Sequence, residues 1–159
     1  MVLFYLNIPG GNYVAAAVFV LAALTDILDG EIARRRNIIS DFGKLMDPIA
    51  DKMLVTAALV ILVERGYVHS AVAIAILTRE FVISGYRAFA ASKGIIIPAG
   101  VMGKLKTVVQ IVAITALLIC AGTTGGFLYI TAQVLIYIAV LLTIVSGVQY
   151  LKDFTKYNK

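Results

Sequence analysis

Long apolar runs separated by short polar connections fill almost the whole chain. Five runs approach the roughly 20 residues that a helix needs to cross a bilayer, and they cover residues 13–33, 43–63, 70–92, 105–121 and 127–151. Glycine, asparagine, threonine and charged residues mark the connections between the runs, as they do in loops. The pattern predicts an all-α, polytopic membrane helix bundle that forms a single domain over residues 1–159.

The composition agrees with this prediction and excludes other classes. The chain is 61% hydrophobic and 14% charged, whereas a soluble domain has about 25% charged residues. The net charge of +5 does not indicate a nucleic-acid partner, because the basic residues stand in connections beside apolar runs. The single cysteine, Cys120, excludes an intramolecular disulfide. His69 has no second ligand near it in sequence, which favours a surface position over metal binding.

The first residues are apolar but too few to span. Residues 1–6 would extend only about 9 Å as a helix, and residues 7–12 have the composition of a loop. We interpret residues 1–6 as the end of a helix whose beginning is missing. The expected fold therefore has six spans, with the first span largely absent.

Positive residues orient the predicted bundle. One side shows only Arg65. The connections and the C-terminal tail on the other side hold Arg34, Arg35, Arg36, Lys44, Lys93, Lys104, Lys152, Lys156 and Lys159. Because cytoplasmic loops carry the excess of lysine and arginine, we expect this second side to face the cytoplasm.

Four aspartates stand at the border of two apolar runs, where an ionised carboxylate is costly unless it is paired or binds metal. Asp26 and Asp29 close one run, and Asp47 and Asp51 open the next. Their i, i+3 and i, i+4 spacings put each pair on one helix face, and a hairpin of two helices would bring the pairs together. Oxygen ligands alone favour Mg²⁺ or Mn²⁺ over Zn²⁺. Paired divalent ions of this kind serve phosphoryl displacement.

The residues around these aspartates form a longer pattern. It reads Asp26-x-x-Asp29-Gly30-x-x-Ala33-Arg34, then eight residues, then Gly43-x-x-x-Asp47-x-x-x-Asp51. The run resembles the signature of the CDP-alcohol phosphatidyltransferases at every fixed position. The resemblance implies a site for CDP-diacylglycerol and two Mg²⁺ or Mn²⁺ ions.

The resemblance also implies a role for each signature residue. Asp51 would be both a metal ligand and the catalytic base that takes the proton of the attacking hydroxyl. The metal ligands would be Asp26, Asp29, Asp47 and Asp51. The residues of the CDP pocket would be Gly30, Ala33, Arg34 and Gly43. Helix packing alone would also explain the small side chains of Gly30 and Ala33.

A second group of charges lies in and after the run at residues 70–92. Arg79 and Arg87 are eight residues apart, about 12 Å along a helix, and Glu80 is beside the first. One interpretation is a buried ion pair. The other is a cationic pocket for the acceptor phosphate, because two arginines and one glutamate leave surplus positive charge. Lys104 and Lys106 would add to that pocket, which suits an anionic alcohol such as glycerol 3-phosphate.

Three shorter runs resemble the branch of the family that uses glycerol 3-phosphate, namely residues 47–52, 78–81 and 103–107. We therefore expect a phospholipid-synthesising enzyme that transfers a phosphatidyl group from CDP-diacylglycerol to glycerol 3-phosphate and releases CMP. The resemblance implies a homodimer in a bacterial cell membrane, in contact with membrane lipid. Two alternatives are the same chemistry on inositol phosphate, inositol or serine, and a cation-transporting bundle. The chain lacks the matched helix-breaking Gly/Pro pairs that transport would favour.

Overall fold

The computed structural model describes residues 10–36, 41–93, 100–121 and 126–157, and it describes the side chains of residues 10–25, 52–93, 100–121 and 126–155. The regular elements in these ranges are all α-helices, which confirms the predicted fold class. They are α2 (Gly11–Arg36), α3 (Asp41–Glu64), α4 (Ser70–Ser92), α5 (Val101–Ile119) and α6 (Phe127–Tyr157). Residues 1–6, the predicted end of a first helix, lie outside the described residues.

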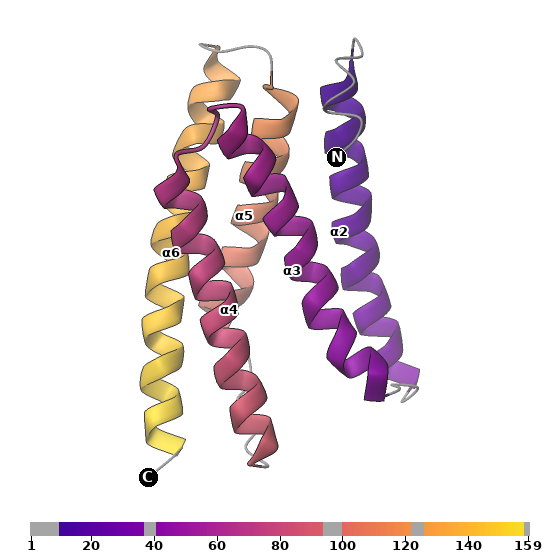
Figure 1. Cartoon of the computed structure of the whole chain (residues 1–159), viewed down its shortest axis with the longest axis vertical. Coiled ribbons are helices and arrows are strands. Elements are labelled where there is room, and N and C mark those ends of the chain that lie inside the picture. Colours follow the sequence, from indigo (N-terminus) through magenta and orange to yellow (C-terminus); the bar gives the residue numbers. More distant parts are fainter. Residues whose placement is uncertain (1–9, 37–40, 94–99, 122–125, 158–159) are drawn as a thin grey trace.

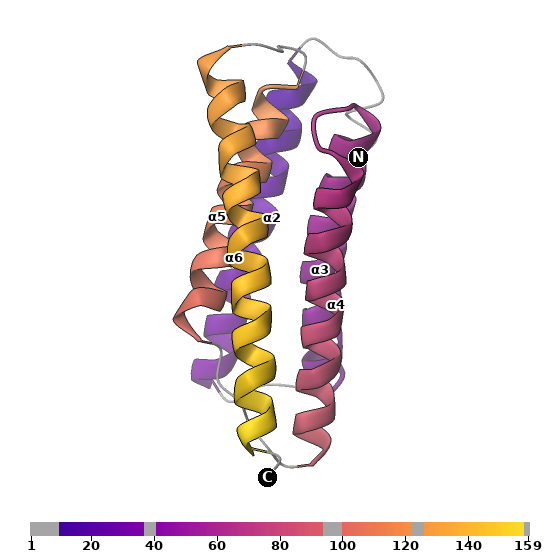
Figure 2. The ribbon, with the colours of Figure 1, turned by 90° about the vertical axis from the view of Figure 1, so that its left-hand side faces the viewer.

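Consecutive helices run antiparallel and form a long bundle (Figures 1 and 2). We call one end of it the aspartate end, defined by residues 26–36 of α2 and 41–51 of α3. It is the lower end in Figure 1, where α4 and α6 also finish and from which α5 rises. The opposite end holds the start of α2 and the turn between α3 and α4. The predicted positive connections thus gather at the aspartate end.

The bundle interior is built from aliphatic side chains of several helices. Helix α5 packs most extensively on α6 and also on α2, α4 packs on α6, and α3 contacts α2, α4 and α5. The largest fully buried apolar side chains are Leu59, Leu62, Ile76, Ile114, Leu117 and Ile136. Fully buried alanines let the helices approach closely, as at Ala113, Ala132 and Ala139.

The outer surface of the bundle is apolar as well. Leu21 on α2 is 63% exposed, Ile74 on α4 63% and Leu141 on α6 62%, and every helix carries side chains of this kind. Monomeric soluble proteins rarely expose contiguous apolar surface on this scale. The hydrocarbon interior of a membrane suits such a surface, because both are apolar.

Hydropathy leads to the same conclusion for part of the bundle. Within the described residues, α5 and the Phe127–Thr155 part of α6 are long and apolar enough to cross a membrane. The Gly11–Thr25 part of α2 is apolar but shorter. Helix α4 has the length for a span but holds Arg79, Glu80 and Arg87. The charge on this helix is therefore concentrated in three side chains.

Threonines on four of the helices form hydrogen bonds from their hydroxyl groups to the backbone of their own helix, so these groups need no water. Each hydroxyl donates to the backbone carbonyl four residues earlier, a bond that suits an apolar environment. The threonines that do so are Thr25, Thr56, Thr107, Thr115, Thr131 and Thr155.

Four of the helices are longer than the apolar runs that predicted them, namely α2, α3, α5 and α6. Helix α5 begins at Val101 after Gly100, which has the extended backbone of an N-cap, whereas the sequence predicted a run that begins at residue 105. Lys104 therefore lies in the first turn of α5 and not in a connection, and Lys106 lies in the second turn. Glycine is tolerated this close to a helix start, so Gly103 did not interrupt the helix. Helix α6 likewise continues to Tyr157.

His69 has a structural role that the sequence did not reveal. It is exposed, as expected, and it is the N-cap of α4, where its Nδ1 accepts a hydrogen bond of 3.2 Å from the backbone N–H of Ala71. Gly66, with φ +74°, makes the preceding turn because glycine adopts a positive φ without steric cost.

Candidate active site

The signature residues lie on two helices that meet at the aspartate end. Asp29 is seven residues before the last residue of α2, and Asp47 is six after the first residue of α3. At 1.5 Å per residue both are about 10 Å from the connection between the helices. Asp26 and Asp51 are each ten residues from those ends, or about 15 Å. Helix register thus supports the prediction that the two pairs share one depth.

The side chains of residues 26–51 lie outside the described part of the structure. The roles predicted for the four aspartates therefore stay predictions, as do those of the CDP-pocket residues Gly30, Ala33, Arg34 and Gly43. Among the described side chains no three metal-ligating groups come together. The chemistry of the aspartate set nevertheless fits a divalent cation, because Mg²⁺ and Mn²⁺ prefer oxygen ligands.

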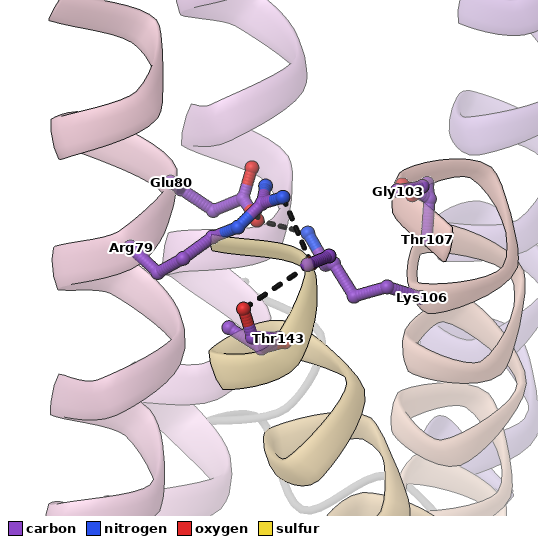
Figure 3. A network of polar contacts seen from close by, with 7 residues as sticks. Arg79, Glu80, Gly103, Lys106, Thr107 and Thr143 are labelled. Carbon is purple, nitrogen blue, oxygen red and sulfur yellow. Dashed lines mark hydrogen bonds and ion pairs between the residues drawn. The ribbon is translucent and has the colours of Figure 1, made fainter. Parts of the chain in front are cut away.

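The described part of the site centres on a buried charge network between α4 and α5 (Figure 3). The Glu80 carboxylate accepts hydrogen bonds from Lys106 Nζ and, at 3.4 Å, from Arg79 Nη1. Lys106 is only 2% exposed, so its charge needs a partner of opposite sign such as this carboxylate. Among the described side chains, Arg79 and Lys106 share the Glu80 carboxylate.

Helix α6 holds the arginine of this network from the other side. Arg79 Nη2 donates to Ser146 Oγ at 3.0 Å, and the Ser146 hydroxyl donates to the Thr143 carbonyl at 3.2 Å. A Cβ atom on Gly147 would lie 3.2 Å from Arg79 Cγ, so the absent side chain makes room for the arginine. Ser146 and Gly147 were not predicted from the sequence, where their only signal is a small-residue pair inside an apolar helix.

The other two predicted acceptor residues lie outside this network. Arg87 is exposed and stands over the Tyr150 ring at 5.4 Å, and Lys104 is exposed in the first turn of α5. The sequence left open an ion pair of Glu80 with either arginine. In the described residues Glu80 pairs with Arg79, and its second partner is a lysine on another helix.

A cavity of about 120 Å³ connects the charge network to the aspartate-bearing helices. Ala23, three residues before Asp26, is in its wall, and so is Lys52, which follows Asp51. The cavity therefore begins about one helical turn from the aspartates. Its described lining comes from four helices: Phe19, Ala23, Lys52, Leu54, Val55, Leu77, Glu80, Lys106, Thr107, Gln110 and Ile111.

Fold and site together define the class of protein: a helical bundle with an apolar exterior, an acidic helix pair at one end and a cationic cavity beside it. The chain belongs to the CDP-alcohol phosphatidyltransferase family, whose model matches residues 1–145. It is therefore a transferase, and the family resemblance of the signature is confirmed.

Curated relatives match nearly the whole chain. A protein from Rickettsia bellii is 38% identical over 157 residues, which is 97% of this chain and 86% of the relative. One from Bacillus subtilis is 39% identical over 144 residues, 91% of this chain and 75% of the relative. One from Haemophilus influenzae is 37% identical over 156 residues, 96% of this chain and 83% of the relative. All three are named CDP-diacylglycerol–glycerol-3-phosphate 3-phosphatidyltransferase.

Proposed function

We propose that this protein transfers the phosphatidyl group of CDP-diacylglycerol to glycerol 3-phosphate, giving phosphatidylglycerophosphate and CMP. The observation that carries the proposal is the cavity lined by Lys52, Glu80 and Lys106 directly beside the aspartate-bearing helix pair. The names of relatives that match most of the chain point to the same two substrates.

The donor occupies the aspartate end. Asp26, Asp29, Asp47 and Asp51 would hold two Mg²⁺ or Mn²⁺ ions, which when bound neutralise the diphosphate charge and stabilise the leaving group. Gly30, Ala33 and Gly43 leave room for the cytidine, and Arg34 pairs with the diphosphate. The acyl chains stay in the hydrocarbon beside the apolar outer surface, and the headgroup reaches the polar end of the bundle.

The acceptor occupies the cavity, with its phosphate near Arg79 and Lys106 and its reactive hydroxyl toward Asp51. Arg87 and Lys104, both exposed, attract the anion on its way in. The hydroxyl oxygen forms a bond to the phosphatidyl phosphorus while the bond from that phosphorus to the CMP oxygen breaks. The hydroxyl proton goes to the Asp51 carboxylate, and CMP leaves as a phosphate monoester.

The protein would act as a multi-pass enzyme of a bacterial cell membrane, with the aspartate end facing the cytoplasm. Water-soluble glycerol 3-phosphate then reaches the site from the side on which positive residues gather. The enzyme would work as a homodimer, a proposal that rests on the family resemblance.

The direct test is CMP release by the purified protein from CDP-diacylglycerol with a panel of alcohols. Glycerol 3-phosphate should support turnover, whereas inositol phosphate, inositol and serine should not. A clear preference for one of the other alcohols would replace the proposed acceptor. The absence of CMP release with every alcohol at saturating Mg²⁺ or Mn²⁺ would contradict the proposed reaction.

The aspartate assignments have a separate test. Asp26→Asn, Asp29→Asn and Asp47→Asn keep the side-chain volume but remove a charge that would face a cation. Each should reduce CMP release by at least about 100-fold, since one lost charged ligand costs several kcal/mol. Near-normal activity of any variant at limiting Mg²⁺ would remove that residue from the ligand set.

A further inference from the structure

One polar group in the cavity wall is left without a partner. Gln110 on α5 is only 3% exposed, and its side-chain oxygen is buried with no hydrogen-bond partner among the described residues. Leaving a buried amide oxygen unpaired destabilises a fold, and an apolar residue would fill the same space. A ligand that enters the cavity and carries a hydrogen-bond donor would pair this oxygen.

Two neighbouring polar groups of the cavity wall are engaged elsewhere. Lys106, one turn earlier on the same helix face, is engaged with Glu80, which already accepts from Arg79. The Thr107 hydroxyl donates to the Gly103 carbonyl at 3.1 Å. The wall therefore combines a cationic part, which suits a phosphate, with a neutral acceptor, which suits a hydroxyl group.

The size of the cavity fits a small polyol. A volume of about 120 Å³ is more than a single water needs. A single water would satisfy Gln110 but leave most of the space empty. A three-carbon chain with a phosphate at one end would fill more of the cavity and place a hydroxyl group against its wall.

We propose that Gln110 determines acceptor specificity by accepting a hydrogen bond from the hydroxyl of glycerol 3-phosphate that does not react. This inference rests on the proposed function and extends it. Sites built to bond a substrate hydroxyl discriminate strongly against an analogue that lacks it, because the buried group is then left unpaired. Gln110 would thus select alcohols with a neighbouring hydroxyl over simpler phosphorylated alcohols.

The test compares glycerol 3-phosphate with 3-hydroxypropyl phosphate, which lacks only the middle hydroxyl. The wild-type enzyme should prefer glycerol 3-phosphate by about 10-fold or more in kcat/KM. Gln110→Met, of similar size and without the amide, should lose most of this preference by reducing kcat/KM for glycerol 3-phosphate alone. Gln110→Asn, which withdraws the oxygen by one methylene, should lose part of it.

Gln133→Met is the matched control. Gln133 lies near the opposite end, where its amide donates to the Tyr67 carbonyl at 2.5 Å and to the Tyr129 hydroxyl at 3.0 Å. Its replacement should leave the preference between the two alcohols unchanged, whatever it does to the yield of folded protein.

The outcomes separate this inference from the proposed function. Failure of the wild type to use glycerol 3-phosphate would contradict both. If the wild type turns over both alcohols with equal kcat/KM, the role of Gln110 is overturned while the proposed function stands. This measurement uses the wild type only, so it does not depend on the folding of any variant. Equal losses for the two alcohols in Gln110→Met would also overturn it, because a packing residue or a water site predicts that result.

Discussion

At the scale of single residues, the site depends on how charges are paired inside an apolar bundle. A buried lysine is costly unless a carboxylate compensates it, and Lys106 meets this condition through Glu80. Arg79 shares the same carboxylate at 3.4 Å. Under the proposed function an incoming phosphate would bring further negative charge to these two cations, so the network would bind an anion as well as hold the helices together.

Lys106→Ala tests this role. Loss of a charge-assisted phosphate contact costs roughly 1.5–3 kcal/mol, which corresponds to about a 10- to 100-fold change. The KM for glycerol 3-phosphate should rise by that factor, while the KM for CDP-diacylglycerol should change little. Lys93→Ala is the control, because Lys93 is an exposed lysine at the same end of the bundle whose ammonium stands over the Phe89 ring. Equal rises in both KM values would indicate that Lys106 only stabilises the fold.

The sequence revealed residues whose role follows from local spacing, and it missed residues whose partners lie on another helix. The depth match of Asp29 and Asp47 could be predicted because it needs only a helix period and a short connection. The pairing of Glu80 with Lys106 depends on how α4 and α5 approach each other, and residues 26 positions apart carry no local signal of it. Gln110 was missed because it stands out only once the cavity is known.

At the scale of elements, α6 packs against α4 and holds the Arg79 side chain of α4 in place. The predicted helices followed from long apolar runs, whereas the start of α5 was placed too late because Gly100 and Gly103 resemble a loop. The contact of Arg79 with α6 could not be predicted, since it depends on the absence of a side chain at Gly147. Ser146 then adds a hydrogen bond that sets the direction of the guanidinium group.

Gly147→Ala should displace the Arg79 side chain from its position against α6. The new Cβ atom would lie 3.2 Å from Arg79 Cγ, so the arginine must move by a few tenths of an ångström, and the KM for glycerol 3-phosphate should rise several-fold. The same substitution made in an Arg79→Ala background should have no further effect on that KM, because the atom it approaches is gone. Gly85→Ala on α4 is the control, since a Cβ there meets nothing within 4 Å. An equal effect with and without the arginine would contradict the proposed contact.

At the scale of the whole molecule, exposed charged residues are distributed unequally between the two ends of the bundle. The described lysines Lys93, Lys104 and Lys152 are exposed toward the aspartate end, whereas Arg65 lies in the turn at the opposite end. Between the two ends the outer surface is apolar. This distribution supports the proposal that the active site lies at one membrane face, where a lipid donor and a water-soluble acceptor can meet.

The orientation can be measured with single cysteines in a Cys120→Ser background, which removes the one native thiol. Lys93→Cys at the aspartate end should react with a membrane-impermeant thiol reagent only after the cells are permeabilised. Gly126→Cys, exposed at the opposite end beside the start of α6, should react in intact cells. The physical reason is that positively charged connections are retained in the cytoplasm during insertion. Labelling of Lys93→Cys in intact cells with protection of Gly126→Cys would reverse the orientation and place glycerol 3-phosphate on the wrong side of the membrane for the proposed reaction.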